Sequence, residues 1–320
     1  MTIHGVVRAR IEDLVQQTLK SAVTFAGVGL HSGQPARMRV QPASADYGIW
    51  FKRTDLHGRD AMIAARWDQV HPSKLCTVVE NAAGVQVSTI EHVMAALAGC
   101  GIQNALIEID GPEVPILDGS AMPFVEAILA RGTRMLDVPV RAFRILERVE
   151  VSDGLSWARL DPSEMLEIDF SIDFTDAAIG QQRKTLNMAN GAFVRELCDS
   201  RTFCRQSDVD AMRRNGLALG GTVENAVVVD GDRILSPGGL RHADEPVRHK
   251  MLDALGDLAL AGAPILGRYT GNRSGHALTN RLLRQLFAQP GAYRLVEVGV
   301  NTGCKLPGVG LSRHDVPVHA

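Results

Sequence analysis

The stretch VRHKMLDALGD, residues 247–257, predicts the helix around which the rest of the chain is arranged. Pro246 precedes it, and proline is tolerated at the first helical position. The acidic residues before the proline, Asp244 and Glu245, suit the positive end of a helix dipole. We therefore expect a helix over residues 246–261. At about 3.6 residues per turn, one of its faces is apolar and the opposite face is polar.

The polar face of this predicted helix carries His249, Asp253 and Asp257, with Lys250 at its edge. Residues four apart are neighbours on a helix, so the side chains of His249 and Asp253 can reach one common point. A neutral imidazole and a carboxylate are ordinary zinc ligands, and Asp257, one turn further on, could orient a neighbouring group. Taken alone, the commoner interpretation is a solvated polar face opposite a buried one. The rest of the chain has to decide between the two.

Composition places the chain among soluble globular proteins. Its 320 residues suffice for one large domain or two ordinary ones, and a formal net charge of −2 argues against a general nucleic-acid binder. The five cysteines form no CxxC pair, which argues against a disulfide framework and indicates a reducing compartment. No apolar run approaches the roughly 20 residues of a membrane span, and the N-terminus lacks the apolar core of a secretory signal. We expect a cytoplasmic protein without stable membrane insertion.

The first half of the chain contains short apolar or alternating segments that predict strands, at 18–25, 35–41, 49–52, 62–65, 74–80 and 104–109. Between the first two lies GVGLHSG, residues 27–33. Its glycine spacing is GxGxxxG rather than GxGxxG, and no strand–helix unit follows it, so we reject a dinucleotide site. On this evidence alone, His31 is a turn residue between two strands.

Residues 87–99, VSTIEHVMAALAG, predict a helix, because Ser88 followed three residues later by Glu91 matches a capping box. Two interpretations of its first turn stand side by side. In one, Glu91 caps the helix and His92 is a surface residue. In the other, His92 is a third metal ligand and Glu91 is a general base beside it. A second helix is predicted from Pro123 until Gly132 closes it.

The second half restarts with strands, and helices follow them. The predicted strands are 145–152, 157–160, 166–174, 225–229 and 293–298, and the predicted helices are 192–198, 207–214, 246–261 and one that His276 opens. Residues 200–205 read as irregular. Strands followed by helices in each half predict an α+β fold. We place a domain boundary after residue 138, which gives an N-terminal extension (1–15), two α+β domains (16–138 and 139–297) and a loose C-terminal tail (298–320).

Together, His92, His249 and Asp253 offer the three protein ligands of a catalytic zinc, with a fourth position open for water. The set is not HExxH, because the glutamate directly precedes the first histidine and the other ligands lie far away in sequence. This pattern argues against a thermolysin-like protease.

A family resemblance follows from six motifs that run in family order: GVGLHSG (27–33), STIEHVMAALAGCGI (88–102), PILDGSAMPFVEAI (115–128), SRTFC (200–204), VRHKMLDALGD (247–257) and SGHALTN (274–280). From about residue 17 to residue 295, the chain resembles the UDP-3-O-acyl-N-acetylglucosamine deacetylases, the zinc hydrolases that commit a cell to making lipid A. The resemblance implies two domains, each a small β-sheet layered on a pair of helices in a β-α-α-β sandwich. It also implies an active site at the domain interface.

The resemblance assigns the reaction residue by residue. It implies that His92, His249 and Asp253 bind zinc, and iron(II) could occupy the same ligands. Glu91 looks like the base that takes a proton from the attacking water, and His276 looks like the acid that protonates the leaving amine. The remaining catalytic residues it implies are Asp257, which would hold His276, and Lys250 and Thr202, which would stabilise the oxyanion.

The resemblance also implies contacts to a small-molecule substrate, UDP-3-O-acyl-N-acetylglucosamine. The expected contact residues are His31, Phe174, Phe203, Asp208 and Arg273. An inserted element, loosely residues 205–245, would supply the apolar groove for the acyl chain. Two departures from the family pattern affect the nucleotide contacts: Arg273 stands where many members have lysine, and Ser156 stands where some carry a basic residue. Cys76 is expected to be an inert buried thiol.

Two alternatives to this enzyme stay open at this point. One is a non-catalytic binder of nucleotide-sugar or acyl ligands on the same fold, which an intact base (Glu91), acid (His276) and ligand set argue against. The other is a zinc hydrolase acting on a different acylated sugar nucleotide, which the motifs do not distinguish from the UDP-3-O-acyl-N-acetylglucosamine deacetylase. We expect a monomer that binds no nucleic acid.

Overall fold

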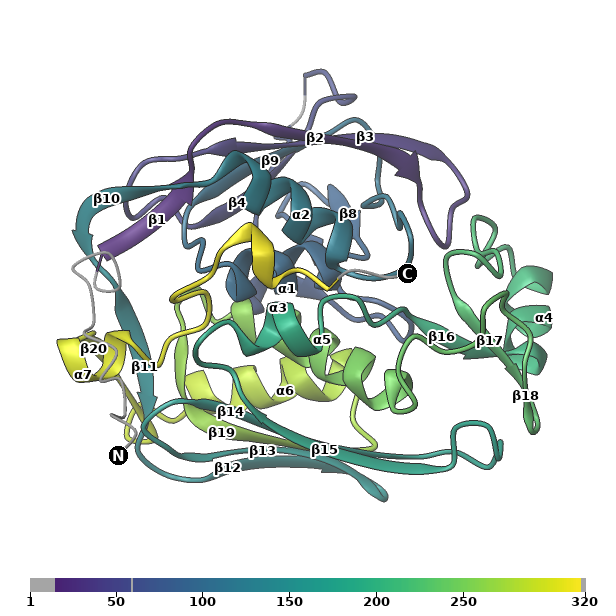
Figure 1. The fold of residues 1–320 in the computed structure, drawn as a ribbon. Helices are drawn as coiled ribbons and strands as arrows, with labels where there is room; N and C mark the ends of the chain where they lie inside the picture. Colours follow the sequence, from purple (N-terminus) through teal and green to yellow (C-terminus); the bar gives the residue numbers. More distant parts are fainter. Residues whose placement is uncertain (1–14, 59, 318–320) are drawn as a thin grey trace.

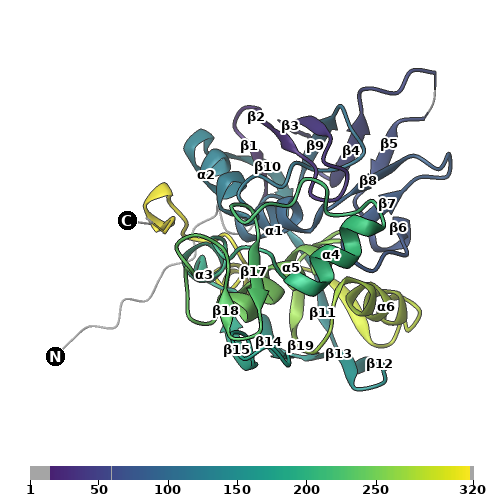
Figure 2. The same ribbon diagram turned by 90° about the vertical axis from the view of Figure 1, so that its right-hand side faces the viewer.

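The structure is a computed structural model that describes residues 15–58 and 60–317. Two sheets form its outer layers, and the longer helices lie between them (Figure 1). The same layering is visible after a rotation of 90° (Figure 2). The predicted α+β class, with small sheets layered on helices, is confirmed. The predicted N-terminal extension, apart from Val15, lies outside the described residues.

The upper sheet in Figure 1 comes from the first half of the chain and has the strand order β2-β3-β9-β4-β5. Its strands are β2 (Val23–Val28), β3 (Pro35–Pro42), β9 (Ala105–Ile109), β4 (Ile49–Arg53) and β5 (Met62–Ala64). Every second residue is buried in β9 and, up to Val40, in β3, which is the period expected of a sheet with one covered face. The helices α1 (Glu91–Gly99) and α2 (Met122–Arg131) lie under this face (Figure 1).

A two-stranded ribbon pairs the beginning of the first half of the chain with its end. Its strands, β1 (Val15–Leu19) and β10 (Thr133–Pro139), are antiparallel. The single strand predicted at 18–25 is therefore divided, because the chain bends at residues 20 and 21 and continues in β2. The boundary placed after residue 138 stays a prediction. A further small sheet contains β6 (Val70–His71), β7 (Val78–Glu80) and β8 (Gln86–Ser88), and a 3-10 turn, η2 (Trp67–Gln69), precedes it.

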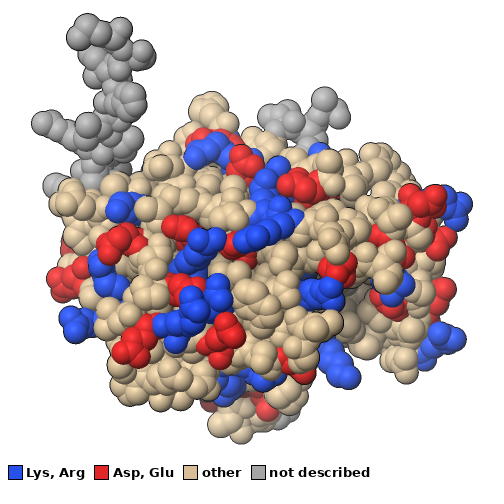
Figure 3. All heavy atoms as spheres, turned by 90° about the horizontal axis from the view of Figure 1, so that it is seen from below, with Lys and Arg blue, Asp and Glu red and all other residues tan. Residues whose placement is uncertain are grey.

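The lower sheet comes from the second half of the chain and has the path β12-β13-β19-β11-β20, with β14 joining β19 to β15. Its strands are β11 (Arg141–Ile145), β12 (Val149–Asp153), β13 (Ser156–Pro162), β14 (Leu166–Asp173), β15 (Gln181–Asn187), β19 (Ile265–Asn272) and β20 (Tyr293–Glu297). The helices α3 (Ala192–Glu196), α5 (Glu245–Ala259) and α6 (His276–Phe287) lie above it (Figure 1). On its outer face, seen from below in Figure 3, acidic and basic side chains are interspersed.

A side element projects from the helical layer at the right of Figure 1. It contains β16 (Phe203–Arg205), α4 (Gln206–Arg214), β17 (Val227–Asp230) and β18 (Arg233–Ile234). The expectation that 200–205 is irregular is wrong for its second half, because Phe203–Arg205 pair in parallel with β17. From Arg205 onward, this side element falls within the range 205–245 that was loosely assigned to the acyl chain.

The described part of the C-terminal tail is not loose. It forms α7 (Val300–Gly303) and a 3-10 turn, η3 (Arg313–Asp315). Leu306 and Val309 are buried, and Asp315 pairs with Arg195 at 3.0 Å. The composition, rich in glycine and proline, did not reveal these contacts because they are made with distant parts of the chain.

None of the helices in the described residues is long and apolar enough to cross a membrane.

Candidate metal centre and active site

Three side chains converge where α1 meets α5. His92 lies in the first turn of α1, and His249 and Asp253 lie four residues apart on α5. Their ligand atoms all lie within 4.8 Å of one another. The Oδ1 atom of Asp253 is 3.3 Å from His249 Nε2 and 3.7 Å from His92 Nε2. Among residues 15–58 and 60–317, these three side chains are the one cluster that could hold a metal ion, and we call this cluster the metal group. All three side chains are buried.

The chemistry of this group suits a divalent cation. Asp253 Oδ1 is buried and has no hydrogen-bond partner among the described residues, so a ligand atom faces the two imidazoles unsatisfied. Burial lowers the pKa of His92 to about 3, and repulsion from His249 adds to the effect. Burial also lowers the pKa of His249. Both imidazoles are therefore neutral at pH 7, and neutral imidazole is the form that binds a metal.

His249 is oriented from the side away from the metal group. Its Nδ1 lies 2.9 Å from the carbonyl oxygen of Ser200, which fixes the tautomer that presents Nε2 to the centre. Glu245, one turn earlier on α5, holds the same segment by accepting hydrogen bonds at 2.9 Å from both the backbone N–H and Nε of Arg201. The sequence placed Glu245 as an acid favoured by the helix dipole. It is instead fully buried and paired with Arg201.

The polar face of α5 is covered rather than solvated. His249, Asp253 and Asp257 are 2, 5 and 3% exposed, because α1 packs across them. Gly256 permits this approach: a Cβ there would lie 2.1 Å from the backbone carbonyl oxygen of Glu91. The commoner interpretation of the polar face is therefore wrong.

Glu91 opens α1 beside the metal group. The predicted capping box is absent, because Ser88 ends β8 and the helix begins at Glu91 without a side-chain cap. The carboxylate of Glu91 turns instead toward Thr77, whose backbone N–H donates to Oε2 at 3.0 Å. Burial raises the pKa of Glu91 to about 7, although the charge of His276 opposes the rise. A carboxyl group with this pKa can accept a proton near neutrality.

His276 begins α6 on the other side of the metal group. Its Nδ1 lies 2.9 Å from Asp257 Oδ2, and its Nε2 lies 3.8 Å from Glu91 Oε1 and 3.9 Å from Asp253 Oδ2. Burial alone would lower the pKa of His276, but the charges of Asp257 and Glu91 raise it to about 9. The ring is therefore protonated at pH 7 and can donate a proton toward the centre.

Lys250 and Thr202 differ in how close they lie to the metal group. Lys250 Nζ donates to Asp253 Oδ2 at 2.6 Å, and although burial opposes it, the charge of Asp253 raises the pKa of the ammonium group. Thr202 is half-buried, and its backbone joins Gly119 and Val227 at 2.8 Å each. The structure thus brings Lys250 directly to the group and holds Thr202 on the segment next to Ser200.

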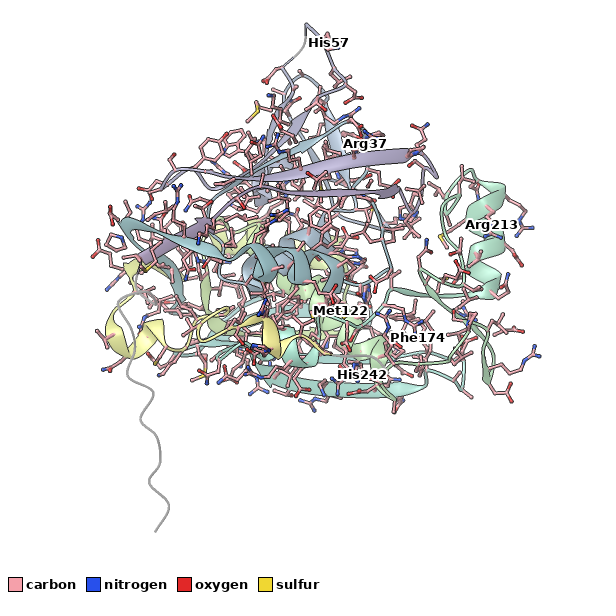
Figure 4. The ribbon with its side chains drawn as sticks, turned by 45° about the horizontal axis from the view of Figure 1, so that its top comes forward. Arg37, His57, Met122, Phe174, Arg213 and His242 are labelled. Carbon is pink, nitrogen blue, oxygen red and sulfur yellow. The ribbon has the colours of Figure 1, made fainter. Side chains whose placement is uncertain are left out.

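A pair of aromatic side chains lies next to His249. The ring of Phe203 lies 6.4 Å from that of His249 and 5.4 Å from that of Phe174, edge to face in both cases. Phe174 lies on the side of the molecule that carries α4, where Arg213 is labelled (Figure 4). These rings can offer an apolar surface to a substrate that reaches the metal group from the side element.

His31 lies in the loop after β2, close enough to His276 to interact with its charge. Both of its ring nitrogens are buried without a hydrogen-bond partner among the described residues. The loop is fixed by Glu113, which accepts from the backbone N–H groups of His31 and Ser32 at 2.8 Å. Burial lowers the pKa of His31; the charge of Glu113 opposes this, and that of His276 adds to it. A neutral ring with unused nitrogen atoms suits a polar ligand.

The remaining two candidates lie at the periphery. Arg273 is partly exposed and pairs with Asp173. Asp208 is exposed in the first turn of α4. Neither residue contacts the metal group in the structure.

Sequence reasoning missed three buried residues that support the site. Thr77 contacts Glu91, Glu113 holds the loop of His31, and Arg201 pairs with Glu245. Arg201 and Glu113 lie inside or beside the motifs that carry the family resemblance, which was the available signal. Thr77 lies in a segment that reads only as a strand. Burial raises the pKa of its neighbour Cys76 to about 12, in line with an unreactive thiol.

Comparison with known proteins identifies close relatives. The family model described as LpxC, UDP-3-O-acyl N-acetylglycosamine deacetylase, matches residues 16–288. A protein of Phenylobacterium zucineum (strain HLK1) is 52% identical over 282 residues, which cover 88% of this chain and 96% of the relative. Relatives from Shewanella woodyi (strain ATCC 51908 / MS32) and Shewanella frigidimarina (strain NCIMB 400) are 46 and 44% identical, and the matches cover 88 and 92% of this chain and 93 and 98% of the relatives. All three relatives are named UDP-3-O-acyl-N-acetylglucosamine deacetylase.

Proposed function

The chain belongs to the family of UDP-3-O-acyl-N-acetylglucosamine deacetylases, and on this premise we propose that His92, His249 and Asp253 hold its catalytic metal as zinc. It is a hydrolase that removes the acetyl group from a UDP-linked acylated amino sugar in lipid A biosynthesis. The family is one of metalloenzymes, and the ligand set of two imidazoles and one carboxylate accommodates zinc or iron(II). When bound, such a cation lowers the pKa of a water ligand and polarises the acetamide carbonyl.

Glu91 is proposed as the general base. One oxygen of its carboxylate is occupied by the backbone N–H of Thr77, and the other faces His276 across 3.8 Å. The side chain directly precedes a metal ligand, so the free oxygen can take the proton of an attacking water. Its raised pKa makes that transfer favourable near neutrality.

His276 is proposed as the general acid. An amine is a poor leaving group unless it is protonated, and the charged ring of His276 lies within 4 Å of both Glu91 and Asp253. Asp257 keeps the ring oriented through Nδ1, so that Nε2 carries the transferable proton. Base and acid are thus separate side chains that approach the centre from α1 and from α6.

Lys250 and Thr202 are proposed to stabilise the oxyanion, and the aromatic pair is proposed to receive the substrate. The ammonium group of Lys250 supplies a fixed positive charge beside Asp253. Phe203 lies beside His249 and Phe174 lies beside Phe203, and these rings together with His31 suit the sugar and its substituents. Asp208 and Arg273 lie further out, where they would meet the nucleotide. We further propose a cytoplasmic monomer, in line with the free thiols of all five cysteines, which lie among the described residues.

The observation that carries this proposal is the convergence of a base, a charged acid and three metal ligands on one buried point. A binding protein has no need of a separate acid and base, so the non-catalytic alternative is not favoured. A hydrolase acting on a different acylated sugar nucleotide would share all of these residues. Turnover of substrates that differ only in acyl-chain length separates that case from the family substrate.

The deciding experiment is a paired measurement on the purified full-length protein. Metal content is determined, and acetate release from UDP-3-O-acyl-N-acetylglucosamine is followed before and after chelation. We expect about one zinc per chain, loss of activity on chelation and recovery on adding zinc back. Recovery with iron(II) but not with zinc would reject the metal assignment. Metal binding without acetate release from any member of the acyl series would reject the deacetylase.

A further inference from the structure

Thr77 connects the proposed base to the partner of the proposed acid. It is 3% exposed and directly precedes β7, between the start of α1 and the last turn of α5. Its backbone N–H donates to Glu91 Oε2 at 3.0 Å, and its hydroxyl group donates to Asp257 Oδ1 at 2.6 Å. The reaction described above assigns no role to this residue.

These two hydrogen bonds, one from the backbone and one from the side chain of Thr77, complete a closed ring of four residues. Asp257 Oδ2 lies 2.9 Å from His276 Nδ1, and His276 Nε2 lies 3.8 Å from Glu91 Oε1, which returns to Thr77 through Oε2. Each carboxylate therefore gives one oxygen to Thr77 and turns the other toward His276. The terminal torsion of a carboxylate is soft, so without such a contact either oxygen could face the ring.

We infer that Thr77 is a positioning residue that orients the base, Glu91, and the acid, His276, relative to each other. Its hydroxyl group fixes the plane of the Asp257 carboxylate, and this carboxylate fixes the ring of His276. Its backbone N–H fixes which oxygen of Glu91 is left to accept a proton. The backbone contact with Glu91 does not depend on the side chain. A substitution of Thr77 therefore tests only the contacts that run from its hydroxyl group through Asp257 to His276. This inference rests on the proposed function only for its kinetic consequence.

The test uses two substitutions in the full-length, metal-loaded protein. Thr77→Val keeps the shape and the backbone N–H but removes the donor to Asp257, and Thr77→Ser keeps the donor. We expect Thr77→Val to lower kcat about ten- to a hundredfold, as a displaced catalytic group does. KM and metal content should stay close to those of the wild type, and the melting temperature should fall by only a few degrees, because one buried hydrogen bond is lost. Thr77→Ser should restore most of kcat, which a purely structural role for the methyl group would not.

A second readout does not depend on turnover. In protein with nitrogen-labelled histidine, the ring N–H of His276 that bonds to Asp257 has its own proton resonance, which His276→Gln assigns by removing it. We expect Thr77→Val to shift or broaden this resonance, with or without bound zinc, and Thr77→Ser to leave it in place. An unchanged resonance in Thr77→Val would overturn the inference whatever the activity. If the wild-type protein releases no acetate but Thr77→Val still shifts the resonance, the positioning role of Thr77 is supported and the deacetylase function is rejected instead.

Discussion

The centre between α1 and α5 and the side element β16–α4–β17–β18 follow opposite rules. In the centre, the ionisable side chains are buried or half-buried, and several are fixed by a hydrogen-bond partner, as His249 is by Ser200 and Glu91 by Thr77. At and beside the side element, the candidate nucleotide contacts are exposed, as Asp208 is, or paired with a local acid, as Arg273 is with Asp173. The centre fixes the positions of its side chains, whereas the side element presents exposed side chains to solvent.

The difference follows from what each region has to do. Proton transfer and metal binding depend on positions fixed to a fraction of an ångström, so burial and hydrogen bonds are concentrated there. Holding a nucleotide or an acyl chain depends on many weak contacts, of which any one can change. The comparison therefore predicts that substitutions in the centre abolish a step, whereas substitutions in the periphery shift an affinity.

The largest effect is expected from His249→Ala, which removes a nitrogen ligand and leaves Asp253 Oδ1 facing a cavity. We expect metal content to fall well below one per chain and acetate release to fall below detection, because two remaining ligands hold a divalent cation weakly. Metal analysis after gel filtration measures the first and a coupled acetate assay the second. His314→Ala, at an exposed histidine in η3, is the matched control and should keep both. Full metal occupancy in His249→Ala would remove this residue from the ligand set.

The second-largest loss of activity, after that of His249→Ala, is expected from Glu91→Ala and from His276→Ala. Each should lower turnover at least about a hundredfold, because each removes one proton transfer. Neither is a metal ligand, so metal content should stay at the wild-type level. Near-normal turnover in either variant would take that residue out of the mechanism and weaken the contrast between centre and periphery.

The pH dependence gives these two residues separate signatures. The active state needs Glu91 ionised and His276 charged. With the pKa of Glu91 raised to about 7, activity is lost as the pH falls through that value; a bound cation nearby would move this limb lower. With the pKa of His276 raised to about 9, activity is lost as the pH rises through that value. The residual activity of His276→Ala should lack the alkaline limb, and a retained limb would assign it to another group.

The comparison also separates what could be predicted from the sequence from what could not. The spacing of His249, Asp253 and Asp257 on one helix follows from helical geometry, and the structure places them as that geometry requires. The meeting of Glu91 with His276, which are distant in sequence, came from the family resemblance, because no local pattern encodes a contact between α1 and α6.

Local patterns failed where a distant contact overrode them. Ser88 and Glu91 match a capping box, yet Ser88 ends β8, Thr89 has φ +58°, and Glu91 bonds to Thr77. Glu245 fits a helix dipole, yet Arg201, 44 residues earlier, binds it. In each case a buried carboxylate needs a hydrogen-bond partner more than it needs the local motif, and its partner comes from a remote segment.

The smallest effect is expected from Arg273→Ala, at the periphery. The side chain is 40% exposed and pairs with Asp173, so its loss removes one screened charge from the path of an anionic nucleotide. We expect KM to rise by roughly three- to tenfold with kcat within twofold, and the rise to shrink at high salt. Arg273→Lys, which keeps the charge but not the planar fork, should lie between the two. Arg183→Ala, at another exposed arginine paired with an aspartate, is the control and should leave KM unchanged. A fall in kcat as large as that of Glu91→Ala would place Arg273 among the fixed groups of the centre, and the division between the two regions would then have to be redrawn.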